Sequence, residues 1–323
     1  MDKKEIAKKI FNTAYINGEF ILRSGKISNE YFDKYLFEAE PELLVEIAKI
    51  MNITALVENT TNDDALKTKH GLSIYIETAK HKILFDVGPN DAFIYNAKQL
   101  GIDLAEIDIF VLSHGHSDHG GALSDFLRVN DKAKIYIHKK AFEPYFIEIL
   151  FAKKYIGLDK KLAANERIIF TDGVLEIDDE LLLFSDVEGQ FDTKSHRVLL
   201  RKTQNGFERD DFLHEQNLIV TSGGKSALFS GCSHRGIANI LRAATKHRAI
   251  NAVFGGFHLY NPVTKAAESP QLIEELATEL SSHETIFYTC HCTGEKAYQS
   301  LREIMGEKVR YFSTGTTVKG SEL

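Results

Sequence analysis

Long hydrophobic runs are absent from this 323-residue chain, and no apolar stretch approaches the length that spans a membrane. The first nine residues, MDKKEIAKK, also lack the apolar core of a signal peptide, so we expect a cytoplasmic protein. Cysteine is scarce. The chain has three, at positions 232, 290 and 292, and an odd number lying near histidines does not suit a disulfide framework.

The chain also has no excess of positive charge. It carries 46 acidic and 39 basic residues and a net charge of −7, which argues against binding nucleic acid over a broad basic surface. A small anionic substrate stays compatible, because a local basic pocket can exist on a net negative surface. The content of 43% hydrophobic and 26% charged residues is typical of a soluble globular protein with a sizeable core. We therefore expect a small-molecule substrate, which could be phosphorylated, and no membrane or nucleic-acid partner. Homo-oligomerisation stays open.

One stretch of the chain concentrates metal-binding side chains. After the apolar run at residues 107–112, His114, His116, Asp118 and His119 lie within six positions and precede two glycines. Imidazole nitrogens and a carboxylate suit zinc, and also manganese or iron. Alternate residues of an extended segment point the same way, so His114 and His116 can converge on one ion. Asp118 and His119 are then placed for a second ion beside it, which predicts a metal site of one or two ions.

The first fifty residues read as a separate appendage, residues 1–50, before a main domain at residues 51–323. Residues 5–15 and 42–50 show helical spacing of apolar side chains. Between them, residues 18–33 resemble the N-terminal segment of orotate phosphoribosyltransferases, in which the lysine matching Lys26 helps to bind substrate. That family's phosphate-binding loop of paired aspartates followed by Thr-Thr-Gly is missing. We therefore predict a small, non-catalytic helical appendage that packs on the main domain or on another chain.

The main domain alternates between strand-like and helix-like segments. The pattern predicts an edge or half-buried strand at residues 51–58, strand pairs in the middle of each half, and helices on the outside. This arrangement indicates two sheets packed face to face and covered by helices. The polar stretch 186–211 is long for a connection and is predicted to form a functional lid. Helices are predicted at residues 90–100, 121–129, 139–156, 236–247, 270–280 and 294–305.

Four later histidines stand at the ends of predicted strands, flanked by glycine or small residues, where chains present side chains to a shared cleft. These are His214, His234, His258 and His291. The remaining histidines, at positions 70, 81, 138, 196, 247 and 283, lack this repeated context. We expect most of them to be surface or ordinary structural residues.

The motif His114-x-His116-x-Asp118-His119 after a strand resembles the metallo-β-lactamase superfamily over about residues 51–323. Segments such as 83–88, 231–234, 255–259 and 291–294 look more narrowly like its dihydropteroate-synthase-like branch. Many members of that branch are known only as metal-dependent hydrolases. One named activity joins a dihydropterin to an aminobenzene ribofuranosyl phosphate in methanopterin synthesis. The resemblance implies an α/β fold, a four-layer αββα sandwich, with the helical N-terminal appendage added.

The resemblance also implies a ligand set. His114 and His116 would bind a first metal, and Asp118 and His119 a second. The superfamily's next ligand, a histidine before a strand, best matches His214.

The superfamily's bridging aspartate follows a glycine at a strand end, and here that place holds Cys232 after Gly231. Three alternatives stay open: the Cys232 thiolate bridges the metals, His234 takes over, or only one metal binds tightly. A thiolate favours zinc over manganese. The last ligand is expected at His291, with His258 as the alternative. The neighbouring cysteines at 290 and 292 point away in an extended segment and are expected to support the packing.

The preferred function is a metal-dependent hydrolase that uses metal-activated water on an ester- or phosphoester-like small molecule. Asp118 is the predicted catalytic residue, which orients the water or moves its proton. His258, Arg235 and Thr293 are candidate substrate-binding residues, the last two because they lie where helices begin and backbone amides could receive a phosphate. Ordinary helix capping is the alternative for both positions. Two other functions are kept: the dihydropteroate-synthase-like condensation, and a non-catalytic metal-binding regulatory protein.

Overall fold

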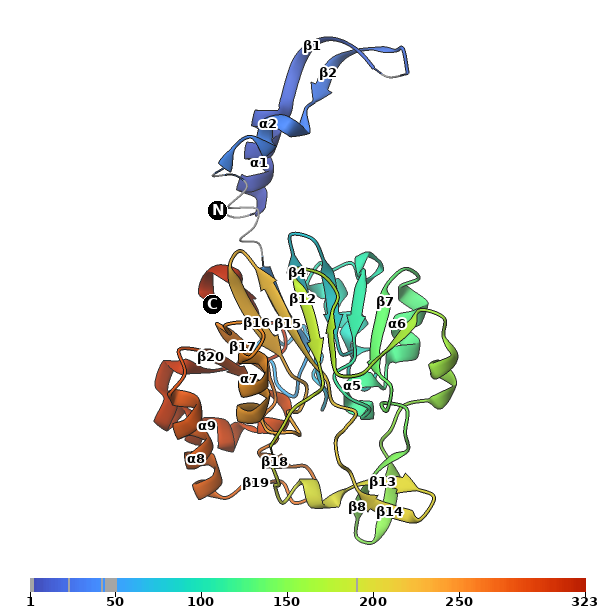
Figure 1. The fold of residues 1–323 in the computed structure, drawn as a ribbon, viewed down its shortest axis with the longest axis vertical. Helices are drawn as coiled ribbons and strands as arrows, with labels where there is room; N and C mark the ends of the chain where they lie inside the picture. Colours follow the sequence, from blue (N-terminus) through green and yellow to red (C-terminus); the bar gives the residue numbers. More distant parts are fainter. Residues whose placement is uncertain (1–2, 23, 42, 44–50, 190) are drawn as a thin grey trace.

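The computed structural model describes residues 3–22, 24–41, 43, 51–189 and 191–323 (Figure 1). Among these residues, seven strands form the first large sheet, in the order β10-β7-β6-β5-β4-β3-β22. The pairs β5–β6, β6–β7 and β7–β10 are parallel, and the others are antiparallel. The strands are β3 (Met51–Val57), β4 (Ser73–Thr78), β5 (Lys82–Phe85), β6 (Ile109–Val111), β7 (Lys134–His138), β10 (Ile168–Thr171) and β22 (Thr317–Lys319).

The second large sheet has the order β11-β12-β15-β16-β17-β20-β21, again with seven described strands. The pairs β16–β17, β17–β20 and β20–β21 are parallel. The strands are β11 (Val174–Glu176), β12 (Leu181–Phe184), β15 (Asn217–Ser222), β16 (Lys225–Phe229), β17 (Ala252–Gly255), β20 (Ile286–Thr289) and β21 (Val309–Tyr311). Parallel neighbours in both sheets mean that several strands of each sheet end at one edge, where the loops that follow them can meet.

Three apolar clusters hold the layers together. The cluster between the two sheets includes the stacked rings of Phe254 and Tyr288, with centroids 4.6 Å apart. The other two clusters lie on the outer faces of the sheets, beneath α4 (Ala92–Gln99) and α6 (Leu123–Val129) on one side, and α7 (Ile237–Thr245), α8 (Pro270–Ser281) and α9 (Glu295–Met305) on the other. In α7 the apolar residues recur at helical spacing, so one face packs on the sheet. This is the predicted arrangement of two sheets between two helical layers (Figure 1).

Two predictions about this main body need correction. β3 is not an edge or half-buried strand, because β22 pairs with it on one side and β4 on the other, and it is buried along nearly its whole length. The helix predicted at residues 139–156 is wrong, because β8 (Tyr145–Ile149) and β9 (Ala152–Tyr155) form a hairpin there. Tyr145 and Ile147 alternate with less buried residues, which is the period of a strand.

The polar stretch predicted as a lid is largely ordered structure. A short 3-10 helix, η3 (His196–Val198), leads into β13 (Leu199–Thr203) and β14 (Gly206–Arg209). These two strands pair with the β8–β9 hairpin into a small sheet of order β14-β13-β8-β9, at the lower end of the body in Figure 1. Tyr145 at the start of β8 packs against His214, with ring centroids 4.0 Å apart, so this small sheet borders the candidate site.

The N-terminal part contains more than helix. The helix predicted at residues 5–15 is confirmed by α1 (Lys3–Ala14), but β1 (Tyr15–Ile21) and β2 (Ile27–Phe32) form an antiparallel hairpin before α2 (Lys34–Glu38). The predicted helix at residues 42–50 lies almost wholly outside the described residues, so the boundary at residue 50 stays a prediction. Within the described ranges, no helix combines the length and apolar character needed to cross a membrane.

Candidate metal centre

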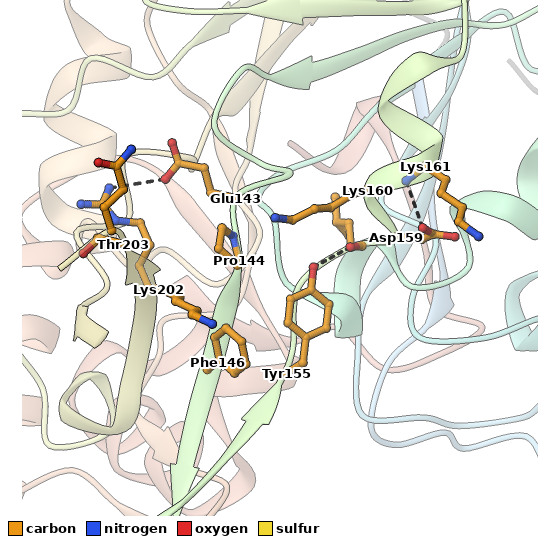
Figure 2. A pocket seen from close by; sticks show the side chains of 12 residues that line it. Glu143, Pro144, Phe146, Tyr155, Asp159, Lys160, Lys161, Lys202 and Thr203 are labelled. Carbon is orange, nitrogen blue, oxygen red and sulfur yellow. Dashed lines mark hydrogen bonds and ion pairs between the residues drawn. The ribbon is translucent and has the colours of Figure 1, made fainter. Parts of the chain in front are cut away.

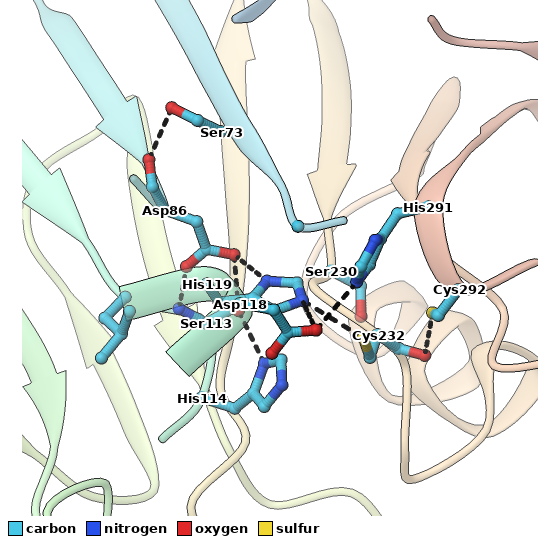
Figure 3. Close-up of polar contacts among 12 residues, drawn as sticks. Ser73, Asp86, Ser113, His114, Asp118, His119, Ser230, Cys232, His291 and Cys292 are labelled. Carbon is cyan, nitrogen blue, oxygen red and sulfur yellow. Dashed lines mark hydrogen bonds and ion pairs between the residues drawn. The ribbon is translucent and has the colours of Figure 1, made fainter. Parts of the chain in front are cut away.

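The loops that follow five strands of the two large sheets supply the side chains of the centre. Asp86 follows β5, His114 follows β6, Cys232 follows β16, His258 follows β17 and His291 follows β20. The strands of each sheet end at a common edge, and Figure 3 shows the side chains from both sheets pointing toward one another. Residues as far apart in sequence as Asp86 and His291 therefore share one buried cluster.

The backbone at this cluster is held in an uncommon conformation. Eight non-glycine residues of the described chain have positive φ, and five of them border the centre. Left-handed backbone is strained for most side chains, and such strain persists where the surrounding structure imposes it, often at functional sites. The five residues are Asp86, Phe212, Ser233, His258 and His291, with φ of 60°, 53°, 54°, 52° and 49°.

A first ligand set consists of three buried histidines, His114, His116 and His234, whose ligand atoms lie within 4.8 Å of one another. Their rings are close to mutually perpendicular, with interplanar angles of 82°, 78° and 83°. Perpendicular rings cannot stack, so their nitrogen-bearing edges can face one point. The Nε2 atoms of His114 and His234 are buried without a hydrogen-bond partner, which is unusual for protein interiors. Three converging imidazoles form a ligand set suited to zinc.

Neighbouring hydrogen bonds prepare His114 for metal binding. The Ser113 hydroxyl lies 2.7 Å from a carboxylate oxygen of Asp86 and donates its proton there, because a carboxylate can only accept. The Ser113 oxygen then accepts from Nδ1 of His114 at 2.9 Å, which leaves Nε2 of His114 unprotonated. Burial and the adjacent imidazoles lower the pKa of His114 well below its ordinary value, so the ring is neutral, the form that binds metal.

A second ligand set consists of Asp118, His119, Cys232 and His291 (Figure 3). Nε2 of His119 lies 3.2 Å from Sγ of Cys232, and an Asp118 oxygen lies 3.2 Å from Nε2 of His291. Burial alone would raise the pKa of Asp118, but His119 and His291 beside it hold that pKa well below its usual range. The set therefore offers two nitrogens, an ionised carboxylate and a sulfur within one small volume.

Two buried carboxylates orient this second set. Asp86 Oδ2 lies 2.6 Å from Nδ1 of His119, which turns Nε2 of that ring toward the other ligands. Metal-binding histidines commonly donate their other N–H to a carboxylate in this way. Glu58 accepts the backbone N–H of His291 at 2.8 Å and the hydroxyl of Tyr311 at 2.9 Å, which fixes the strained loop after β20.

Comparisons with known proteins identify this architecture. Residues 67–199 match the model of the metallo-β-lactamase superfamily. The solved structure of Tm1679, described as a metal-dependent hydrolase of the β-lactamase superfamily, is 27% identical, with a TM-score of 0.70. The alignment covers 83% of this chain and 98% of that one. This chain has the metallo-β-lactamase fold, and residues 67–199 match the sequence model of that superfamily. Superfamily members bind metal ions, and the fold supports a metal-dependent, hydrolase-type role.

Two relatives match different parts of the chain. A protein of Methanocaldococcus jannaschii named 7,8-dihydropterin-6-methyl-4-(β-D-ribofuranosyl)-aminobenzene-5'-phosphate synthase is 28% identical over 307 residues, covering 86% of this chain and 100% of its own. An orotate phosphoribosyltransferase of a Nocardioides species is 50% identical over 46 residues, which are 14% of this chain and 26% of that enzyme. The second likeness is therefore confined to a short segment.

His214 lies beside the first ligand set, and hydrogen bonds engage both nitrogens of its ring. Its Nδ1 accepts the backbone N–H of Gly115 at 2.9 Å, so its proton is on Nε2, which lies 3.1 Å from Asp210. Both nitrogens of His214 are thus engaged within the protein. His116, Asp210 and His214 do place ligand atoms within 4.8 Å of one another, and Nε2 of His116 lies 3.3 Å from Asp210; the unpartnered nitrogens of the first ligand set belong to His114 and His234.

The structure shows where the alternative ligands lie, both for the pair Cys232 and His234 and for the pair His291 and His258. Cys232 lies with the second set and His234 with the first, so neither stands in the other's place. His291 lies beside Asp118, whereas His258 lies with His196 and His234 on one side and with two cysteines on the other. The ligand roles themselves remain predictions.

The three predicted substrate-binding residues differ in whether their side chains face a cavity. Arg235 lines a cavity of about 230 Å³ together with His234, although its guanidinium also donates to backbone carbonyls of residues 187 and 211. Thr293 is fully buried. Its hydroxyl oxygen accepts the backbone N–H of Phe257 and also hydrogen-bonds to the hydroxyl of Thr289. Its side chain therefore ties the loop before α9 to the loop after β17, and it does not cap α9, whose N-cap is Gly294. His258 is buried, and both its ring nitrogens lack a partner.

The sequence did not single out several residues of the centre. Asp86, Asp210 and Cys292 carry no local signal beyond their position near strand ends. His196, grouped with the surface and structural histidines, is 5% exposed and lies beside the cluster, with Nε2 3.3 Å from Nδ1 of His234. It comes from the stretch that was predicted as a lid, where nothing in the spacing points to the centre.

A larger cavity, of about 1050 Å³, lies at the small sheet rather than at the centre (Figure 2). Its walls carry Lys160, Lys161 and Lys202 together with Glu143 and Asp159, and none of the candidate metal ligands lines it. Together with Arg201, the walls hold four basic and two acidic residues. The 230 Å³ cavity beside His234 borders the metal centre.

Proposed function

We propose that this chain is a metal-dependent hydrolase that uses metal-activated water on an ester- or phosphoester-like small molecule. The observation that carries the proposal is the pair of adjacent ligand sets, three histidines beside an Asp-His-Cys-His set. The donor atoms fit zinc, and the thiol makes manganese a poorer match. When bound, such ions lower the pKa of water and stabilise negative charge on the reacting group.

Asp118 is placed to act on the water. Its side chain is 27% exposed, unlike the fully buried His119 and His291 beside it, so it faces both the ligand set and the solvent. Because its pKa is held low, the carboxylate is ionised at neutral pH and accepts a hydrogen bond from water. It is therefore placed to orient the water by accepting a hydrogen bond from it.

The cavity beside His234 is the proposed entrance for substrate. Phe191 and Phe212 line it together with two arginines and three aspartates, so an apolar part and a polar part of one small molecule could be held there. Phe212 stacks on His234 with an interplanar angle of 3° and a centroid distance of 4.4 Å, which fixes one wall against the first ligand set. Aromatic faces with a few polar groups are usual in small-molecule sites.

A second candidate function is the dihydropteroate-synthase-like condensation. It is supported by the 28% identity to the Methanocaldococcus jannaschii synthase, which extends over that protein's whole length. In this reaction the arylamine displaces pyrophosphate from the pterin, and no water takes part. The ligand sets would then hold the leaving group, while Arg235 and the N-terminal amides of α7 lie close enough to His234 to receive a phosphate.

One experiment separates these functions. The purified chain is loaded with zinc or manganese and offered phosphodiesters, lactones, thioesters, and a pterin pyrophosphate with an aminobenzene ribofuranosyl phosphate. We expect turnover of one of these substrate classes, and we expect His116→Ala to lose it. The matched control is His247→Ala, at an exposed histidine in the turn after α7, which should retain the turnover. Bound metal without any turnover would support the non-catalytic alternative. A protein that binds no metal, or activity unaffected by His116→Ala, would contradict the proposal.

A further inference from the structure

A third group of possible metal ligands lies beside the two sets already described. Sγ of Cys232, Sγ of Cys292 and a ring nitrogen of His258 lie within 4.8 Å of one another. All three residues are buried, with 3%, 4% and 6% of their surfaces exposed. They come from the loops after β16, β20 and β17, so three neighbouring parallel strands present them at one edge of the sheet.

The unpartnered imidazole of His258 points to a ligand. Neither ring nitrogen has a hydrogen-bond partner, although the ring is more than nine-tenths buried. An unsatisfied buried polar group costs about 1–3 kcal/mol and needs an explanation in a native structure. His258 also keeps positive φ, at 52°, so the fold holds this side chain in place at a further cost.

A third ion at His196, His234 and His258 fits less well. Those ligand atoms are also within 4.8 Å, but the rings of His196 and His258 are stacked, with an interplanar angle of 13° and centroids 4.4 Å apart. The lone pair of a ring nitrogen lies in the ring plane, so two stacked rings cannot both aim at one ion. This leaves the cysteine pair as the direction in which His258 can bind.

The chain leaves room for the Cys292 sulfur. A Cβ atom at Gly256 would lie 2.3 Å from Sγ of Cys292, so only glycine fits there. The sulfur lies 3.5 Å from the carbonyl oxygen of Cys232 and faces the same loop. Ligands of a tetrahedral zinc ion are about 3.3–3.8 Å apart, given metal–ligand distances of about 2.0–2.3 Å, so a closing movement of about 1 Å would seat an ion.

We propose that Cys232, Cys292 and His258 form a third site for a thiophilic divalent ion such as zinc or cadmium. The Cys232 thiolate belongs to this site and to the Asp118-His119-Cys232-His291 set, since a thiolate sulfur has enough lone pairs to bridge two ions. Three protein ligands leave one of the four coordination positions of a tetrahedral ion open.

The inference shares Cys232 with the ligand sets of the proposed function, so the experiment counts bound ions and leaves turnover aside. The full-length chain is stripped with a chelator, reloaded with cadmium and freed of excess ion. Bound cadmium is then measured by mass spectrometry, and thiolate-to-cadmium charge transfer by ultraviolet absorption. The variants are Cys292→Ser and His258→Asn. The matched control is Cys290→Ser, because Cys290 is equally buried but belongs to none of the ligand groups.

We expect each test variant to bind one cadmium ion fewer than the wild type, and Cys292→Ser to lose part of the charge-transfer absorption as well. Cys290→Ser should match the wild type in both measurements. Equal cadmium content in the wild type, Cys292→Ser and His258→Asn would overturn this inference and leave the proposed function intact. A wild type that binds no ion would contradict both. His258→Asn keeps the cysteines, so it tests the site even where Cys292→Ser folds poorly.

Discussion

Asp86 offers the sharpest test of how this centre is built, because one buried carboxylate aligns both ligand sets. Its Oδ2 lies 2.6 Å from Nδ1 of His119 and 2.7 Å from the Ser113 hydroxyl, and its Oδ1 accepts the Ser113 N–H at 2.7 Å. In Asp86→Asn, the amide oxygen can still accept the backbone N–H, but the NH₂ group then faces Nδ1 of His119. That nitrogen must become an acceptor, so the proton moves to Nε2, the atom that faces Cys232.

The expected effect is on metal affinity. Removing the carboxylate partner of a metal-binding histidine weakens metal binding by about 10- to 100-fold, which is about 1.4–2.8 kcal/mol. Asparagine tolerates the left-handed backbone of Asp86, whose φ is 60°, so the loop conformation should survive. The affinity is measured by competition with a chromophoric chelator in wild type and Asp86→Asn.

The chain provides a control for this substitution. Asp178 Oδ2 also lies 2.6 Å from a histidine nitrogen, Nε2 of His81, and its Oδ1 accepts two backbone N–H groups, but His81 precedes β5 whereas Asp86 follows the other end of that strand. Asp178→Asn should change stability and leave metal affinity unchanged. If Asp86→Asn binds metal within twofold of the wild type, Asp86 does not set the His119 tautomer and the reasoning fails.

Two further predictions follow from the same geometry. His234→Ala should weaken binding of the first ion at least about tenfold in a calorimetric titration. His214→Ala should weaken it less, because both nitrogens of His214 are already engaged in hydrogen bonds. The reverse order of the two affinities would show that His214 is the ligand. Burial, opposed by Asp172, lowers the pKa of His138 to about 4 from the ordinary 6.5. Between these two values the unfolded chain binds a proton that the folded chain does not, so the free energy of unfolding falls as the pH falls from 6.5 toward 4. At pH 5 the loss is about 2 kcal/mol, and His138→Gln should remove that part of the change in urea unfolding free energy between pH 7 and pH 5; an unchanged pH dependence would contradict it.

The sequence predicted most of the fold because its strands and helices carry strong periodic patterns. Residues 139–156 were the exception. Pro144 and a mixture of apolar and charged residues left both periods readable there, and pairing of β8 with β13, more than fifty residues later in the chain, selected the strand. Pairing with a distant partner cannot be read from a local pattern. The same reason hid β22, which completes the first sheet beside β3.

The sequence by itself determined where a metal site is to be expected. His114, His116, Asp118 and His119 are so closely spaced that the loop must bring them together in any fold. Only the tertiary structure decided which distant residues join them. It separates His234 from Cys232, places His214 against Asp210, and adds Asp86, His196 and Cys292. A ligand set depends on distances of a few ångströms and on which nitrogen of each ring is free, and both are fixed by packing and hydrogen bonds between strand ends.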